Sequence, residues 1–363
     1  MPDLIDLLSR TVAAGGSDLH LTTGAPPMAR ISGSLAPLIE AALDADACRS
    51  LVLGILTESQ RARLEEDWEL DFAFQVDGLG RFRANAHYSR GSLEAAFRAI
   101  PEAIPELGTL GHRESVFQLC ELQRGLVLVT GITGSGKSTT MAAMVQQISR
   151  RRSGVIVTIE DPVEYIFQNA TSIVKQREVG SDTRSFSEAL RHALRQDPDV
   201  ILVGEMRDPE TISAAITAAE TGHLVLATLH TIDAPKAVDR MVDAFPGDQQ
   251  PQIIAQLANS LEAIVSQRLI RKEDGSGRVL ATEMLAANAA VRACIRERRW
   301  EQLVGLIEIG AKDGMHTIDE DLAGLYLSRT ISKEDAIANA RDRNAIEALL
   351  RESTPPPKRG LFR

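Results

Sequence analysis

The chain has 363 residues, of which 44% are hydrophobic and 25% are charged, and its formal net charge is −10 with a pI of about 5.3. This length predicts two or three domains, and the acidic balance and 4% aromatic content argue against a protein that coats nucleic acid. The three cysteines lack metal-ligand spacing, and neither a signal peptide nor a run of about 18 apolar residues is present, so we expect a cytoplasmic chain that reaches a membrane only through a partner.

Residues 1–100 predict a small α+β domain with a mostly antiparallel sheet. An amphipathic helix is expected first, over residues 4–14, with Leu4, Leu7, Leu8 and Val12 on its apolar stripe. A stretch without periodicity, with two prolines and two glycines, ends the domain, and we place a linker at residues 101–112. Alternation and hairpin signals predict strands over 17–21, 28–31, 71–76, 81–86 and 94–100, and helices over 44–56 and 58–66.

From residue 113 to residue 350, short apolar strands alternate with helices. Two of the helices begin at capping residues, Ser185 and Asp208. This alternation predicts an α/β domain with a mainly parallel sheet covered on both faces, followed by a helical C-terminal part with one strand pair around residues 274–277. The Pro-rich tail, residues 351–363, is expected to be disordered. The buried strands are expected over 126–129, 155–159, 200–203 and 224–228.

A glycine-rich loop stands between the first of these strands and the helix that follows it. It reads Gly131-Ile132-Thr133-Gly134-Ser135-Gly136-Lys137-Ser138. Strand, glycine loop and helix in this order are typical of a P-loop, whose backbone N–H groups and helix dipole hold phosphate oxygens. The alternative, an accidental glycine-rich turn, leaves the flanking strand and helix unexplained. In this interpretation Lys137 reaches the outer phosphates and Ser138 holds Mg²⁺, and the nucleotide-binding residues are Gly131, Thr133, Gly134, Ser135, Gly136, Lys137, Ser138 and Thr139.

Acidic and histidine side chains follow the other predicted strands, at the edge where parallel sheets bind ligands. An NTPase also needs a metal ligand, an acid that places or activates water, and positive charge near the γ-phosphate. Glu160-Asp161-Pro162-Val163-Glu164 follows one strand, and Glu205 follows the next in the place of the acid that supports Mg²⁺. His230 is a candidate for sensing the γ-phosphate, and His223 is a weaker one. A hydrogen-bonded structural histidine is the alternative for each.

The sequence gives weaker signals for the base of the nucleotide and for the positive charge needed near the γ-phosphate. The guanine-reading Asn-Lys-x-Asp motif is missing from the sequence, which favours ATP over GTP. Beside the acids, Arg207 is expected to form a salt bridge with Glu205. The strand-like segments of the first domain offer Arg81, Arg83 and Arg98 as candidates for the γ-phosphate, although an arginine at such spacing is more often a surface charge.

Four motifs in order resemble the Walker A, Asp box, Walker B and His box of the type II/IV secretion ATPase superfamily. Within it, the chain resembles the PilT/PilU family of type IV pilus retraction ATPases over nearly its whole length except the tail. The residues that carry the resemblance are 131–138, 158–165, 195–211 and 221–231, together with 17–21, 24–28, 290–296 and 314–319.

The resemblance implies a PAS-like N-terminal domain and a RecA-like ATPase domain, assembled as a homo-hexamer with ATP and Mg²⁺ between the two domains. It assigns the catalytic glutamate to Glu164, with Glu160 as second choice, and the Walker B acid to Glu205. It assigns the γ-phosphate arginines to Arg83 and Arg98. It further implies a motor for pilus retraction and twitching motility, driven by domain rotation at the inner face of the inner membrane. Its partners would be an inner-membrane platform protein and possibly a sister retraction ATPase, and not nucleic acid.

The sequence departs from the family pattern in one helix. Arg296-Glu297-Arg298-Arg299 stands where Arg-Glu-Gly-Lys is usual, and Val291 replaces isoleucine. Because this helix is linked to retraction, the choice between a main motor and an accessory ATPase of PilU type stays open. A pilus-extension or type II secretion ATPase is disfavoured by the missing four-cysteine motif. A nucleic-acid translocase is disfavoured by the lack of a basic, aromatic pore loop.

Overall fold

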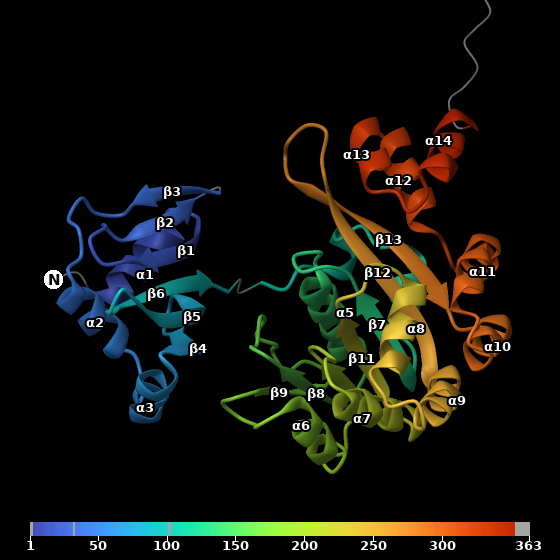
Figure 1. Cartoon of the computed structure of the whole chain (residues 1–363), viewed down its shortest axis with the longest axis horizontal. Helices are drawn as coiled ribbons and strands as arrows, with labels where there is room; N and C mark the ends of the chain where they lie inside the picture. The colour runs from blue at the N-terminus through green and yellow to red at the C-terminus, as the bar shows by residue number, and fades with distance from the viewer. Residues whose placement is uncertain (1–2, 32, 101–102, 353–363) are drawn as a thin grey trace, which may run out of the picture. The chain divides into compact units, whose positions relative to one another are not determined.

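The structure, a computed structural model, describes residues 3–31, 33–100 and 103–352, and it divides into two compact units (Figure 1). The first unit is Met1–Ala103 with Pro162–Ile166, and the second is Ile104–Asp161 with Phe167–Arg363. Within those ranges, no helix combines the length and apolar character needed to cross a bilayer. The three cysteines are free and buried. The predicted disordered tail, residues 351–363, begins two residues too early, because residues 351–352 belong to the last helix; residues 353–363 fall outside the described residues.

The first unit is built on a six-stranded sheet with the order β3-β2-β1-β6-β5-β4, in which every neighbouring pair is antiparallel. The predicted helices and strands are all present. β3 is additional, and the sequence did not reveal it because this short edge strand has no buried side to create an apolar period. The elements are α1 (Leu4–Ala13), β1 (Gly16–Leu21), β2 (Met28–Ile31), β3 (Ser34–Pro37), α2 (Ala45–Leu53), α3 (Glu58–Asp67), β4 (Glu69–Val76), β5 (Gly80–Ser89) and β6 (Ser92–Ala99).

The helices of the first unit cover one face of this sheet with an apolar core. Leu19 on β1, Phe97 on β6 and Ala84 on β5 are in register and buried in that core. The predicted stripe of α1 was wrong at one position, because Val12 is 38% exposed and Thr11 is buried in its place. A helix turns by 100° per residue, so the position seven residues after Leu4 lies nearer the centre of the stripe than the position after it.

The second unit contains a seven-stranded mixed sheet with the order β13-β12-β7-β11-β10-β8-β9. All neighbours are parallel except β12 and β13, which form the strand pair predicted around residues 274–277. β9 was not predicted, since this edge strand is largely polar and lacks an apolar run. The strands are β7 (Gly125–Thr130), β8 (Val155–Glu160), β9 (Ile173–Glu178), β10 (Val200–Val203), β11 (Leu224–Leu229), β12 (Leu261–Arg271) and β13 (Arg278–Ala286).

Alternate residues of the central strands point to opposite faces of the sheet and pack in two separate cores. Leu126 and Leu128 of β7 pack in one core with α6 to α11, whereas Val127 and Val129 pack in the other with α4 and α5. A third cluster packs α12, α13 and α14 beside the β12–β13 hairpin (Figure 1). The helices are η1 (Leu107–Thr109), α4 (Glu114–Leu119), α5 (Lys137–Arg151), α6 (Phe186–Ala193), α7 (Pro209–Glu220), α8 (Ala234–Asp243), α9 (Gln250–Ser260), α10 (Ala289–Arg296), η2 (Trp300–Gln302), α11 (Leu303–Ile309), η3 (Ala311–Asp313), α12 (Ile318–Leu327), α13 (Lys333–Ala338) and α14 (Arg343–Glu352).

Candidate functional site

The predicted P-loop connects the end of β7 to the start of α5. Its three glycines all take positive φ angles, and α5 begins at Lys137. At Gly131 a Cβ atom would lie 2.4 Å from Ser135 Oγ and 2.6 Å from the carbonyl oxygen of Gln267, so only glycine fits there. Tight packing at this position therefore fixes where the loop leaves the sheet.

Lys137 closes the loop from inside. Its Nζ donates hydrogen bonds to the carbonyl oxygens of Gly131, at 2.8 Å, and of Ile132, at 3.1 Å. Ser138, the next residue, is exposed, and so are Thr133 and Gly134 in the middle of the loop. The loop thus presents backbone and hydroxyl groups at the N-terminus of a 15-residue helix, which is an arrangement that binds phosphate.

A second group forms where β10 and β11 end, next to the P-loop strand in the sheet order. Glu205, just after β10, accepts hydrogen bonds from Arg207 Nε at 2.5 Å and Nη2 at 2.7 Å, as predicted for this pair. His230, just after β11, places Nε2 3.2 Å from Glu205 Oε1. Burial alone would raise the pKa of Glu205, but the hydrogen bond from Arg207 and the nearby His230 lower it overall. The Glu205 side chain is thus an ionised carboxylate.

A hydrogen bond that the sequence did not suggest joins the ends of these two strands. The hydroxyl of Thr228 on β11 donates to the carbonyl oxygen of Gly204 at 2.5 Å, next to Glu205. The backbone N–H of Met206 donates in return to the carbonyl oxygen of Thr228. Threonine is a common strand residue, so its type and position carried no signal for this role.

The two candidate acids after β8 differ in their surroundings. Glu160, the last residue of β8, accepts at Oε1 from the hydroxyl of Thr158 at 2.6 Å and from Gln176 Nε2 at 3.2 Å. Glu164 is exposed and belongs to the segment Pro162–Ile166 of the first unit. Hydrogen bonds therefore hold the first carboxylate at the end of its strand, whereas the second stands in contact with solvent.

The candidate arginines lie within strands of the first unit. Arg83 on β5 and Arg98 on β6 are direct partners in the sheet register, and both are exposed. Arg98 Nε donates to Asp18 Oδ1 on β1 at 2.8 Å, and Arg30 on β2 is the partner of Asp18 in turn. We call these four residues the arginine row. The row runs along the sheet face opposite to the helix-covered core.

His223 does not lie near the phosphate-binding loop. His223 precedes β11, whereas the loop follows the end of the parallel strand β7. The two therefore lie at opposite ends of these strands. Its Nδ1 makes a hydrogen bond of 2.9 Å with the carbonyl oxygen of Ala218. The weaker of the two histidine candidates is therefore structural, and its suggested role at the γ-phosphate was wrong.

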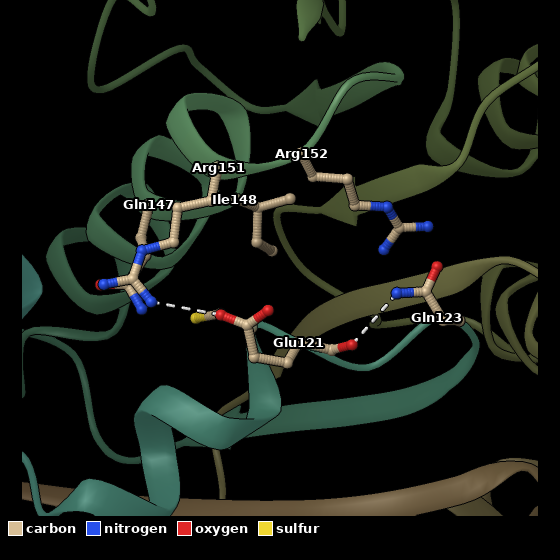
Figure 2. A pocket seen from close by; sticks show the side chains of 7 residues that line it. Glu121, Gln123, Gln147, Ile148, Arg151 and Arg152 are labelled. Atoms are coloured by element: carbon tan, nitrogen blue, oxygen red, sulfur yellow. Dashed lines mark hydrogen bonds and ion pairs between the residues drawn. The ribbon is translucent and has the colours of Figure 1, made fainter. Parts of the chain in front are cut away.

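A pocket of about 180 Å³ in the second unit lies away from the P-loop (Figure 2). The ion pair between Arg151 and Glu121, 3.2 Å long, crosses its wall. Arg151 ends α5 and Lys137 begins it, so the pocket and the phosphate-binding loop are separated by the helix length of about 22 Å. The pocket is not part of the candidate nucleotide site.

Comparison with known proteins gives consistent matches. The family described as "Type II/IV secretion system protein" matches residues 90–349. The chain is 45% identical to the "Type IV pilus retractation ATPase PilT" of Pseudomonas aeruginosa, over 93% of this chain and 98% of that relative. It is 41% identical to the "Type IV pilus ATPase PilU" of the same species, over 95% and 90%. The crystal structure of the pilus retraction motor PilT with bound ADP matches with a TM-score of 0.90 and 46% identity, over 96% of this chain and 100% of that one.

Proposed function

The chain belongs to the type II/IV secretion system protein family and is an ATP-hydrolysing pilus retraction enzyme within it, and from this premise we propose that it works as a homo-hexameric motor for twitching motility. The observation that carries the proposal is the P-loop closed by Lys137 beside the Glu205–His230 pair. Together these groups offer a phosphate cradle and an ionised carboxylate at one edge of a parallel sheet.

Mg²⁺ fits the residues at this edge. Within the residues described above, no group of three or more His, Cys, Asp or Glu side chains is placed to hold a metal alone. Magnesium in nucleotide sites is usually held by one or two protein groups together with phosphate oxygens and water. The exposed hydroxyl of Ser138 and the ionised Glu205 are such groups. When bound, the ion would neutralise charge on the β- and γ-phosphates.

In the proposed reaction, each remaining candidate has one task. Glu164, with a free exposed carboxylate, orients the attacking water and accepts its proton. His230 contacts Glu205 and reports the presence of the γ-phosphate to it. Arg83 and Arg98 supply positive charge to the γ-phosphate when the first unit of the motor rotates toward bound ATP.

The proposed assembly extends beyond one chain. We propose that the first unit is the PAS-like domain and the second unit the RecA-like ATPase domain of the motor. In the working hexamer, nucleotide is bound between the two kinds of domain. The motor acts in the cytoplasm at the inner face of the inner membrane, and it passes the rotation to an inner-membrane platform protein of the pilus. The identity to PilU supports a second candidate, an accessory ATPase that assists a sister motor.

Substitution of Lys137 tests the nucleotide site. Lys137→Ala removes the ammonium that closes the loop, and we expect ATP turnover of the purified protein to be lost. Lys312→Ala, at an exposed position in η3, is the matched control and is expected to keep wild-type turnover. Undiminished hydrolysis in the first variant would contradict the site. Turnover of the wild-type protein, alone and mixed with a sister ATPase, separates a main motor from an accessory one.

A further inference from the structure

The chain enters the second unit through residues 104–113, here called the connecting segment, which lies along α5. Near the end of α5, Gln146 Nε2 donates to the carbonyl oxygen of Ile104 at 3.4 Å, and Arg150 forms an ion pair with Glu106. Leu107, the next residue, is buried in the same core as the apolar side of α5. The start of the connecting segment therefore packs against the C-terminal half of α5, and its end reaches the first turn of the helix, where His112 contacts Thr140.

At that first turn, His112 of the connecting segment meets two buried polar side chains. Its Nε2 lies 2.9 Å from the hydroxyl of Thr140 and 3.4 Å from Gln267 Nε2 on β12. Gln267 Nε2 also donates to the Thr140 hydroxyl at 2.7 Å. Thr140 is 2% exposed and Gln267 is 1% exposed, so neither exchanges these partners for bulk water.

A neutral ring fits this triad. The amide nitrogen of Gln267 can only donate, and it donates to Thr140 Oγ1. The Thr140 hydroxyl keeps its own proton, which it can donate to an unprotonated His112 Nε2 at 2.9 Å. Burial lowers the pKa of His112 to about 4, while Asp321 opposes the shift and His316 adds to it, so the ring is neutral near pH 7.

Thr140 stands three residues after Lys137, and its backbone N–H donates to the carbonyl oxygen of Gly136. This backbone hydrogen bond joins Thr140 directly to the last glycine of the loop. We propose that His112 is a positioning residue, which ties the connecting segment to the phosphate-binding loop through Thr140, so that nucleotide at the loop orders residues 104–113. The inference rests on the proposed function, because it needs nucleotide at this loop.

Hydrogen exchange with and without ADP tests the link. In the wild type, ADP is expected to protect amides of both the loop and residues 104–113. In His112→Leu, the loop stays protected but residues 104–113 do not, and KM for ATP rises about fivefold with little change in kcat, since one neutral hydrogen bond is lost. His112→Gln, whose Oε1 accepts at a similar reach, restores the wild-type behaviour.

Three further variants separate this role from a merely structural one. Thr140→Val keeps the shape but removes the hydroxyl, and it is expected to reproduce the His112→Leu phenotype, with no added effect in the double variant. His316→Leu is the matched control, because it removes a buried histidine that bonds to Thr282 instead of α5. It leaves the protection of residues 104–113 intact.

The outcomes are distinguishable. If ADP protects residues 104–113 of Thr140→Val as it does in the wild type, the inference fails while the proposed function stands, and this holds even where His112→Leu does not fold. If ADP leaves the loop of the wild type unprotected, the proposed function and the inference fail together.

Discussion

The two sheets of this protein place their candidate residues in opposite ways. In the parallel sheet, Lys137, Glu205 and His230 follow the ends of strands, and the shared direction of those strands brings the residues to one edge. In the antiparallel sheet, Arg83 and Arg98 lie within strands β5 and β6, and only the register makes them neighbours. Positions at strand ends can be read from a sequence, whereas a row across strands needs the pairing.

The cost of the two arrangements differs as well. The loop around Lys137 is held by its own backbone carbonyls, so its charge is compensated locally. Two arginines directly opposite each other repel, and such pairs destabilise a sheet unless an opposite charge is near. Asp18 supplies that charge to Arg98. The first unit thus keeps exposed positive charge at some cost in stability, which fits a role in binding.

The largest effect is expected from a substitution in the phosphate-binding loop at the end of β7. Gly131→Ala places a Cβ against Ser135 Oγ and the Gln267 carbonyl, so we expect nucleotide binding and ATP turnover to be lost. Gly275→Ala, in the turn between β12 and β13, is the control, since its φ of +70° is also strained for alanine but no atom lies within 4 Å of the added Cβ. Equal activity of the two variants, measured by steady-state turnover, would show that the tight packing at residue 131 is unimportant.

The arginine row supplies the next test. Joint replacement of Arg83 and Arg98 by alanine is expected to lower kcat by on the order of 10³, the scale of an arginine that stabilises the γ-phosphate transition state. Arg30→Ala, in the same row but paired with the Gly33 carbonyl, serves as the control. An equal loss in the control would mean that the row acts by general charge and not by two specific side chains.

A smaller loss of kcat is expected to distinguish the roles of Glu160 and Glu164. Glu164→Gln is expected to lower kcat by about 10², as removal of a general base does. Glu160→Gln keeps the shape of a side chain that is already bound to Thr158 and Gln176, so its effect on kcat is expected to be smaller. A larger loss from the Glu160 change, in the same turnover assay, would move the catalytic role to Glu160.

The smallest effect concerns stability in the first unit. The pKa of Asp18 is raised by burial but lowered overall by hydrogen bonds from Ser17 and Arg98. A lowered pKa in the folded state stabilises the protein above the ordinary value of 3.8, and this contribution disappears as the pH falls through the lower folded value. Asp18→Asn is expected to cost about 1 kcal/mol in urea unfolding at pH 7. If the difference in the free energy of unfolding between the wild type and Asp18→Asn did not shrink below pH 3.8, this account would be refuted.

The sequence alone determined the phosphate-binding loop, the buried strands and the acids that follow them. Glycines, capping residues and apolar runs act within a few residues of chain, so the preferences of residues 131–139 were readable without the fold. The same locality explains why α1 lies close to its predicted residues 4–14, and why α6 and α7 begin after the predicted capping residues Ser185 and Asp208.

The tertiary structure decided what depends on contacts between distant segments. Strand register aligns the arginine row, and packing buries Thr11 in place of Val12. The parallel direction of β7 and β11 places His223 at the end of the strands opposite to the phosphate-binding loop. The tertiary structure also brought His112 to Thr140 and Gln267, which are far apart in the chain. Single polar residues on strands and loops have many possible partners, and only the packed arrangement of elements selects one.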